Sequence, residues 1–213
     1  NFSRITKKIS LAAKEKGADI GSNPNLRLAI EKARQINMPK ENIERAIKKG
    51  VGEINGGSLE SFTFEAYGPS GIAIIVEGIT DNIKRTVSEF KAILNKYGGK
   101  FAETGAVRWL FDKKGSITVE ITDKEDSMTM TIIESGAEDF YQNNNEITII
   151  TSPENFERTK IFLEQKKFVI KKSLITWMPK ETVKKPKESD YNHFLEALGN
   201  YEDIQEIYLN TSL

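Results

Sequence analysis

Hydrophobic residues in the first 50 positions recur at spacings of three and four, the period that lines up one side of a helix. The pattern predicts three short helices, separated by turns at 21–24 and 37–39 and closed by Gly50. Their apolar positions are Phe2, Ile5, Ile9 and Ala12, then Leu26, Ala29, Ile30 and Ala33, then Ile43, Ala46 and Ile47. Such faces can bury one another, so a small helical bundle is expected.

The segment 50–57 contains four glycines and no apolar period. Glycine-rich stretches of this kind behave as flexible connectors. We therefore expect a hinge that lets the helical part move relative to the rest.

Beyond the hinge, the pattern alternates between strand and helix periods. Strands are expected at 62–67, 72–79, 106–111, 116–121, 138–141, 147–151, 168–177 and 204–209. Helices are expected after a cap at Asp81, over 126–133, from Pro153, and around 191–198, and a turn is expected at 113–115. Trp109 and Trp177 fall at hydrophobic positions of predicted strands, which indicates buried packing.

The order of elements from 115 to 178 is β-α-β-β-α-β, the split βαβ arrangement of a ferredoxin-like domain. The final strand at 204–209 needs a sheet to join, because an orphan strand leaves its backbone groups unpaired. The unfinished sheet at 62–111 lacks one helix and one strand. The fold class is therefore α+β: a three-helix domain (1–56) and two ferredoxin-like α/β domains, the third (113–182) inserted into the second (57–112 and 183–213).

Charge is distributed unevenly along the 213 residues, although the formal net charge is zero. Residues 1–50 contain 12 of the 31 Lys and Arg but only five of the 31 Asp and Glu, so the remainder is acidic. A basic module on an acidic body indicates an anionic partner for the first part. Lopsided charge is also common in small helical pieces, and this second explanation stays open.

Composition excludes several classes of site. There is no Cys, and His193 is the single His, which excludes disulfides, thiolate chemistry and multi-histidine metal sites. No apolar run approaches the about 18 residues of a membrane span. The turn 68–71 does not have the spacing of a phosphate-binding glycine loop. We expect no enzyme, cofactor, metal, small-molecule substrate or membrane partner.

Five ordered blocks along the chain resemble the signature blocks of the YebC/PmpR family. They are NMPKENIERAIKKG (37–50), YGPSGIAIIVEGITDN (67–82), GGKFAETGAVRWLF (98–111), MPKETV (178–183) and EDIQEIYLN (202–210). The resemblance implies a three-domain protein, cytoplasmic in bacteria or mitochondrial in eukaryotes. Bacterial members are described as probable DNA-binding transcriptional regulators, and related members act with ribosomes. It also implies a basic GHSKW-containing stretch ahead of Asn1.

The basic helical surface is the candidate binding site. The residues expected to contact phosphates are Arg45, Lys48 and Lys49 on the third helix and, with less support, Arg4, Lys7, Lys8 and Lys14 on the first. Should acidic side chains of the folded body neutralise these cations, the proposed surface would not exist.

Three candidate roles follow from the sequence. The first is a monomeric regulator that binds DNA with little sequence preference. The second is a translation factor that binds ribosomal RNA or tRNA on the ribosome, and the third is a protein-interaction adaptor. Stacking of RNA bases on Phe140, Tyr141 or Phe168 is a further possibility, although core packing is expected for all three.

Overall fold

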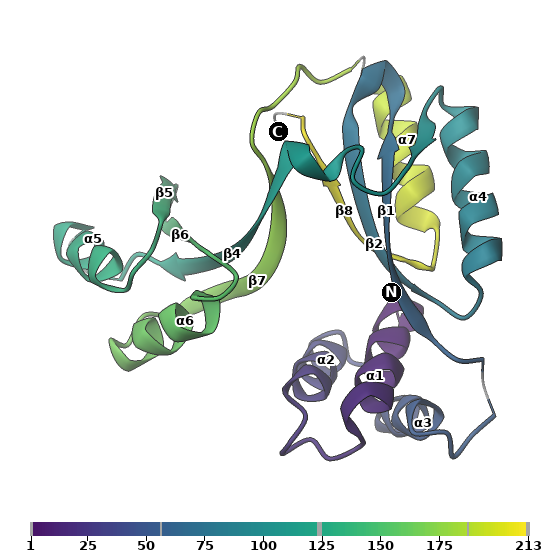
Figure 1. Cartoon of the computed structure of the whole chain (residues 1–213). Coiled ribbons are helices and arrows are strands. Elements are labelled where there is room, and N and C mark those ends of the chain that lie inside the picture. The colour runs from purple at the N-terminus through teal and green to yellow at the C-terminus, as the bar shows by residue number, and fades with distance from the viewer. Residues whose placement is uncertain (1, 56, 123–124, 187, 212–213) are drawn as a thin grey trace. The chain divides into compact units, whose positions relative to one another are not determined.

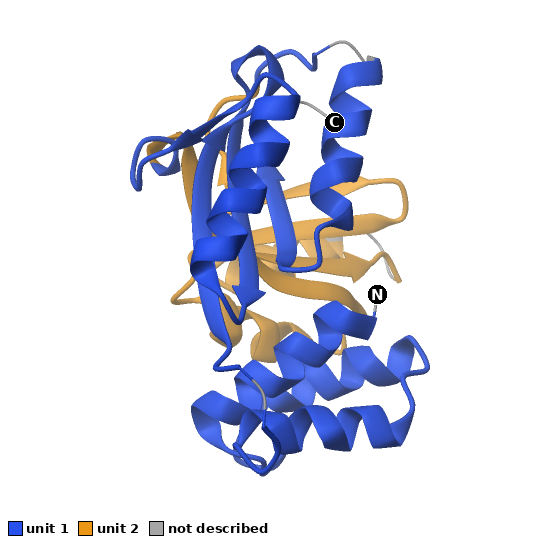
Figure 2. Cartoon of the chain, turned by 90° about the vertical axis from the view of Figure 1, so that its right-hand side faces the viewer, with its two compact units in different colours: residues 1–108, 183–213 blue, residues 109–182 orange. Residues whose placement is uncertain are grey.

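The computed structural model describes residues 2–55, 57–122, 125–186 and 188–211, and these form two compact units. The first unit contains residues 1–108 and 183–213, and the second contains residues 109–182 (Figure 2). Gly56, part of the predicted hinge, lies outside the described residues.

Three helices open the first unit: α1 (Phe2–Lys16), α2 (Pro24–Gln35) and α3 (Lys40–Gly50). The three predicted helices are confirmed. Asn23 caps α2 by accepting a hydrogen bond from the Leu26 amide, and Pro24 occupies the first turn, where no backbone donor is needed. The core between the helices contains Ile9, Ala12, Ala13, Leu26, Ala29, Ile30, Ala33, Met38, Ile43 and Ala46. The apolar stripes read from the sequence are thus the buried faces.

The first unit also holds an antiparallel sheet in the order β3-β1-β2-β8. Its strands are β1 (Glu60–Tyr67), β2 (Ala73–Thr80), β3 (Lys100–Ala102) and β8 (Ile204–Leu209), and its helices are α4 (Ile83–Lys96) and α7 (Glu188–Asn200). Both helices lie on one face of the sheet (Figures 1 and 2). Phe64, Phe90 and Phe194 are among the side chains buried in the core there. The last strand therefore completes a sheet that begins 144 positions earlier, at Glu60.

The second unit is a four-stranded antiparallel sheet in the order β5-β6-β4-β7. Its elements are β4 (Phe111–Glu120), α5 (Glu125–Glu134), β5 (Asp139–Asn143), β6 (Glu146–Thr151), α6 (Phe156–Gln165) and β7 (Ile170–Pro179). Ile117, Ile132 and Ile149 are fully buried in its core. The predicted split βαβ order and its α5 helix are confirmed.

Several predicted elements around the join between the units are wrong. The third strand of the first sheet is β3, and 106–111 is not a strand: a short 3-10 helix, η2 (Arg108–Leu110), leads into β4. The turn expected at 113–115 lies inside β4, where Gly115 pairs with Ile175. The carboxylate of Glu65 explains the irregular backbone, since it accepts hydrogen bonds from the amides of Gly105, Val107 and Arg108, each at 2.8 Å.

Two predicted helix starts are displaced. Asn82, and not Asp81, caps α4 by accepting a hydrogen bond from the Arg85 amide at 3.1 Å. Asp81 instead forms an ion pair with Arg85. In the second unit, Pro153 belongs to a turn, and α6 begins at Phe156. The other short helix, η1 (Pro69–Gly71), makes the predicted connection between β1 and β2.

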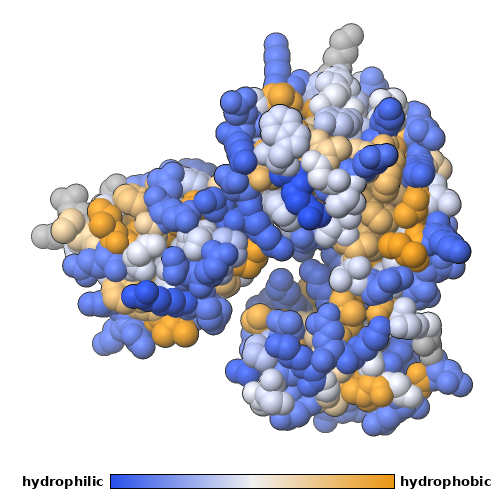
Figure 3. Space-filling model, viewed as in Figure 1, coloured by the Kyte–Doolittle hydropathy of each residue, from blue (hydrophilic) through white to orange (hydrophobic). Residues whose placement is uncertain are grey.

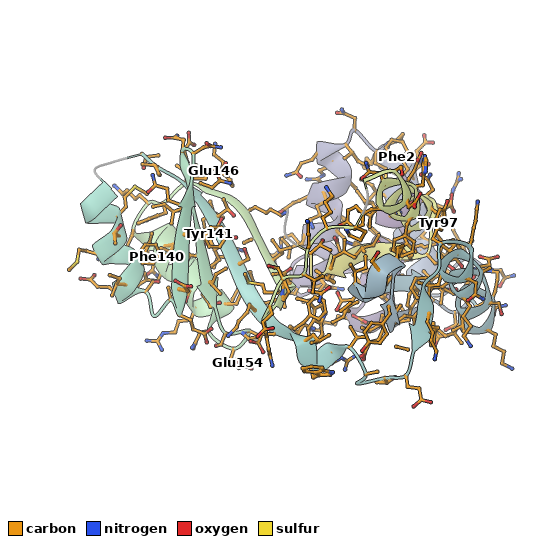
Figure 4. The ribbon with its side chains drawn as sticks, turned by 90° about the horizontal axis from the view of Figure 1, so that it is seen from above. Phe2, Tyr97, Phe140, Tyr141, Glu146 and Glu154 are labelled. Carbon is orange, nitrogen blue, oxygen red and sulfur yellow. The ribbon has the colours of Figure 1, made fainter. Side chains whose placement is uncertain are left out.

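The aromatic side chains are less uniformly buried than expected. Trp109 is 65% exposed, so its predicted burial is wrong, and Trp177 is half-buried with the Lys113 ammonium over its ring. Phe140 and Phe168 pack against the core of the second unit as expected, whereas Tyr141 is half-exposed. Phe140 and Tyr141 are neighbours on β5 and so face opposite sides of the sheet (Figure 4).

Candidate nucleic-acid interface

Two of the predicted phosphate contacts on α1 form ion pairs within the first unit. The Lys7 ammonium pairs with the carboxylate of Asp203, whose side chain is only 4% exposed. The next residue, Lys8, pairs with Glu206 on β8 at 3.1 Å. These cations attach the helical part to the last segment of the chain.

The other two basic residues predicted on α1 are also engaged. Arg4 donates hydrogen bonds to the carbonyl oxygens of Gly199 and Tyr201. Lys14 donates to the Ser58 hydroxyl and the Leu59 carbonyl, both at 2.8 Å. The α1 cations thus hold the helical part against the α/β part of the first unit, which argues against the free movement expected of a hinge.

Asp203 is the centre of a buried polar cluster. Its carboxylate accepts hydrogen bonds from Lys7, from the Thr86 hydroxyl at 2.7 Å and from the Tyr201 hydroxyl at 3.1 Å, and it also pairs with Arg85. Burial alone would raise the pKa of Asp203, but the hydrogen bonds and the charges of Lys7 and Arg85 lower it from 3.8 to about 2. The carboxylate is therefore ionised at neutral pH.

The basic residues predicted on α3 are placed differently. Ile43 and Ala46 face the core, while Arg45 and Lys48 are exposed and Lys49 is partly exposed on the opposite side of the helix. Among the residues that the structure describes, none of these three cations forms an ion pair. Hydrophilic side chains cover much of the helical domain on the face shown in Figure 3.

The acidic partners of α1, Asp203 just before β8 and Glu206 within it, are the feature that the sequence did not identify. The only signal for them was the excess of acidic residues outside 1–50. Part of that acidic excess forms ion pairs with Lys7 and Lys8 of α1. The basic charge of residues 1–50 therefore has a different explanation on each helix. On α1 the cations bind to groups elsewhere in the first unit, and on α3 they lie on an available surface.

Other kinds of site have no support in the described part of the chain. No group of three or more His, Asp or Glu there could hold a metal ion. No helix in those ranges is long and apolar enough to cross a membrane. His193 is exposed on α7.

Two models of known protein families match this chain. The model of the TACO1/YebC protein N-terminal domain matches residues 1–53, and that of the TACO1/YebC second and third domain matches residues 59–211. The chain belongs to the TACO1/YebC family. The family resemblance of the five sequence blocks is thereby confirmed.

TACO1/YebC relatives match along the whole chain. A probable transcriptional regulatory protein of Caldanaerobacter subterraneus subsp. tengcongensis is 45% identical over 217 residues, covering 100% of this chain and 89% of the relative. One from Thermotoga maritima is 42% identical over 214 residues, covering 98% and 84%. TACO1/YebC is a family of probable transcriptional regulators and not of enzymes.

The fold of the chain is also that of a solved structure. The crystal structure of a conserved hypothetical protein, Aq1575, from Aquifex aeolicus matches with a TM-score of 0.83 and 39% identity, covering 99% of this chain and 88% of that one. A helical domain followed by two four-stranded antiparallel sheets is therefore a shared architecture, and the predicted α+β fold class is confirmed.

Proposed function

We propose that this protein regulates gene expression by binding the phosphate backbone of DNA through the exposed side of α3. The relatives' description as probable transcriptional regulatory proteins supports the first part. The observation that favours α3 is that Arg45, Lys48 and Lys49 lie together and form no ion pair with the residues that the structure describes, whereas Lys7 and Lys8 of α1 are paired with acidic side chains.

The spacing of the three side chains suits a backbone contact. Residues three and four apart are neighbours on a helix, so Arg45 lies beside both Lys48 and Lys49. Clustered cations bind phosphates by releasing counterions, which gives affinity without sequence information. Glu41 and Glu44 lie four positions before Arg45 and Lys48, but neither pairs with these cations in the structure, and Glu44 pairs with Lys40 at 3.6 Å. We therefore propose weak sequence preference.

The test is a salt titration of duplex DNA binding with the triple variant Arg45→Gln, Lys48→Gln, Lys49→Gln. Each phosphate contact contributes about 0.9 to the slope of log K against log salt on B-DNA. The slope should fall by about 2 to 3, and affinity near 100 mM salt should fall at least tenfold. Thermal unfolding of the variant should match that of the wild type, since the three side chains form no ion pair within the described ranges.

A matched control removes the same charge elsewhere. Lys166, Lys167 and Lys172 are exposed in the second unit, and changing all three to Gln should leave the slope within about 0.5 of wild type. Equal loss in both triple variants would mean that only net charge matters, and the α3 assignment would be wrong. A wild-type protein that binds DNA with no salt dependence would contradict the proposal, and one that does not bind DNA at all would favour a protein-interaction adaptor.

The choice between DNA and RNA is decided by competition. A structured RNA and a duplex DNA of equal phosphate number are added to the same complex. On the proposed function, the RNA does not displace the DNA preferentially. If the RNA displaces the bound DNA at a concentration a hundredfold lower than the competing DNA needs, α3 is assigned to RNA binding. That result would contradict a role in transcription.

A further inference from the structure

A pocket of about 170 Å³ lies where the C-terminal ends of α1 and α3 meet the segment that leads into β1. It is lined by Ser10 and Lys14 from α1, Lys49 and Gly50 from α3, and Gly52, Gly57, Ser58 and Leu59 from the connection. Two lysines from different helices therefore line one small space, and the glycines contribute only backbone around it.

The hydrogen bonds of Lys14 hold its side chain at this pocket. Its ammonium group donates to Ser58 and Leu59, both pocket residues, and three donors are available, so one remains for a ligand. Lys49 has no ion pair among the residues described. The carboxylate of Asp81 is close to Gly57, but its charge is paired with Arg85 at 2.7 Å.

We propose that this pocket binds a single phosphate group, with Lys14 and Lys49 on either side of it. The proposal rests on the proposed function, because the phosphate it assigns is one in the backbone of the bound nucleic acid. Lys49 belongs both to the α3 surface and to the pocket, so a strand that follows Arg45 and Lys48 can place a phosphate there. A phosphate held between two lysines fixes the register of the backbone on the protein.

A purely structural explanation of the two lysines makes a different prediction. Cations in the last turn of a helix interact favourably with its unpaired carbonyl groups, and Lys14 and Lys49 both lie in such turns. However, Lys14 donates to Ser58 and Leu59, which lie beyond the α1 terminus. Helix stabilisation alone predicts that replacing either lysine lowers stability and leaves anion binding unchanged.

The first experiment uses inorganic pyrophosphate as the probe and amide NMR shifts of the full chain as the readout. Saturable shifts should be confined to residues 50–52 and 57–59. Lys14→Gln and Lys49→Gln should each weaken binding at least fivefold. Lys16→Gln is the matched control, since Lys16 shares the last turn of α1 with Lys14 but does not line the pocket, and it should change the affinity less than twofold. Shifts spread over α3, or equal losses in all three variants, would overturn the proposal.

The second experiment asks whether the phosphate belongs to a nucleic acid. In the salt titration of duplex DNA, the double variant Lys14→Gln, Lys49→Gln should lower the slope by about 0.9, the value for one shared phosphate, and the single variants should not be additive. A fall of about 1.8 would mean two separate phosphates and overturn the shared site.

The two proposals can fail separately. Pyrophosphate binding at the pocket without DNA binding would refute the proposed function and assign the pocket to a free anion. DNA binding through α3 with no pyrophosphate shifts at residues 57–59 would refute the pocket and leave the proposed function in place.

Discussion

Lys7 on α1 and Asp203, 196 residues later in the chain, form an ion pair that is largely removed from solvent. The pair joins the first helix to the segment that enters the last strand. Arg85 and Thr86 of α4 reach the same carboxylate, so three elements meet at one acidic side chain. A buried charge with this many partners is costly to remove, because each partner is left unpaired.

Replacing Asp203 with Asn should therefore destabilise the protein markedly. Loss of one member of a buried pair costs about 3 to 5 kcal/mol. The pKa of Asp203 is about 2 in the folded chain against 3.8 ordinarily, so its ionised form favours folding. That contribution is complete above about pH 5 and should shrink by about 2 kcal/mol as the pH falls toward 2.

Urea denaturation of wild type and Asp203→Asn between pH 2 and 7 measures this difference directly. The matched control is Glu206→Gln, whose partner Lys8 is also on α1 but whose side chain is 48% exposed. It should cost less than about 1 kcal/mol. A difference between wild type and Asp203→Asn that stays constant down to pH 2 would show that Asp203 is not the group that titrates.

Glu65 makes a second prediction, for the backbone that leads out of the first unit. Burial alone would raise the pKa of Glu65, but hydrogen bonds from the amides of Gly105, Val107 and Arg108 lower it. Glu65→Gln replaces one acceptor oxygen with a donor that faces an amide. An unpaired buried donor costs about 1 to 3 kcal/mol, and stability should fall by that amount at pH 7.

Hydrogen exchange locates the effect of Glu65→Gln. The amides of Val107 and Arg108 should exchange at least tenfold faster, whereas those of α1 should be unchanged. Because the pKa of Glu65 is lowered from its ordinary value of 4.5, the advantage of wild type over the variant should shrink as the pH falls below that value and disappear once the carboxylate is protonated in the folded chain. An unchanged exchange rate at Val107 would show that other contacts hold this segment.

The elements that could be predicted from the sequence are those marked by the spacing of hydrophobic residues within the element itself. Ile9, Leu26 and Ile43 follow the helical period, and each is buried where that period requires. In the second unit, Ile117 and Ile147 alternate with polar residues, and both lie in the core. Such faces can be identified because the side chains that pack together recur at fixed spacings.

The errors have a common physical cause, which is dependence on distant partners. The segment 106–111 has the composition of a strand. However, the Glu65 carboxylate, about 40 residues earlier in the chain, accepts hydrogen bonds from backbone amides at 105–108, and the backbone there is not extended. The first helix likewise has the pattern of a free basic surface, and the partners of Arg4, Lys7 and Lys8 are 195 or more residues away. No local pattern contains that information.

Close packing of α1 on α3 supplies a third prediction. A side chain at Gly50 would place its first carbon 2.3 Å from the Ser10 carbonyl oxygen and 2.8 Å from the Ala13 side chain. Gly50→Ala should force the helices apart and lower stability by about 1 to 3 kcal/mol. Thermal unfolding measures the loss.

The comparison for Gly50→Ala is Gly52→Ala, which tests backbone strain without crowding. Gly52 has a φ of +84° and no atom within 4 Å of the added carbon. Its replacement should cost about 1 kcal/mol through the left-handed conformation alone. If Gly50→Ala proves as stable as wild type, the close contact between α1 and α3 is incorrect.

The last prediction separates the basic residues of the two helices by what their loss changes. Lys7→Gln leaves Asp203 with fewer partners and should lower the free energy of unfolding by at least 1.5 kcal/mol, within the range for charged hydrogen bonds. Lys48→Gln should change it by less than about 0.5 kcal/mol, because Lys48 is exposed and unpaired among the described residues. Binding should show the reverse: Lys48→Gln lowers the salt slope on DNA by about 0.9, and Lys7→Gln leaves it unchanged. The free energy of unfolding and the salt slope are therefore both measured on both variants. Each variant should change one of the two quantities and leave the other unchanged. If Lys7→Gln instead weakens DNA binding at unchanged stability, the Lys7–Asp203 pair opens in solution and α1 belongs to the binding surface.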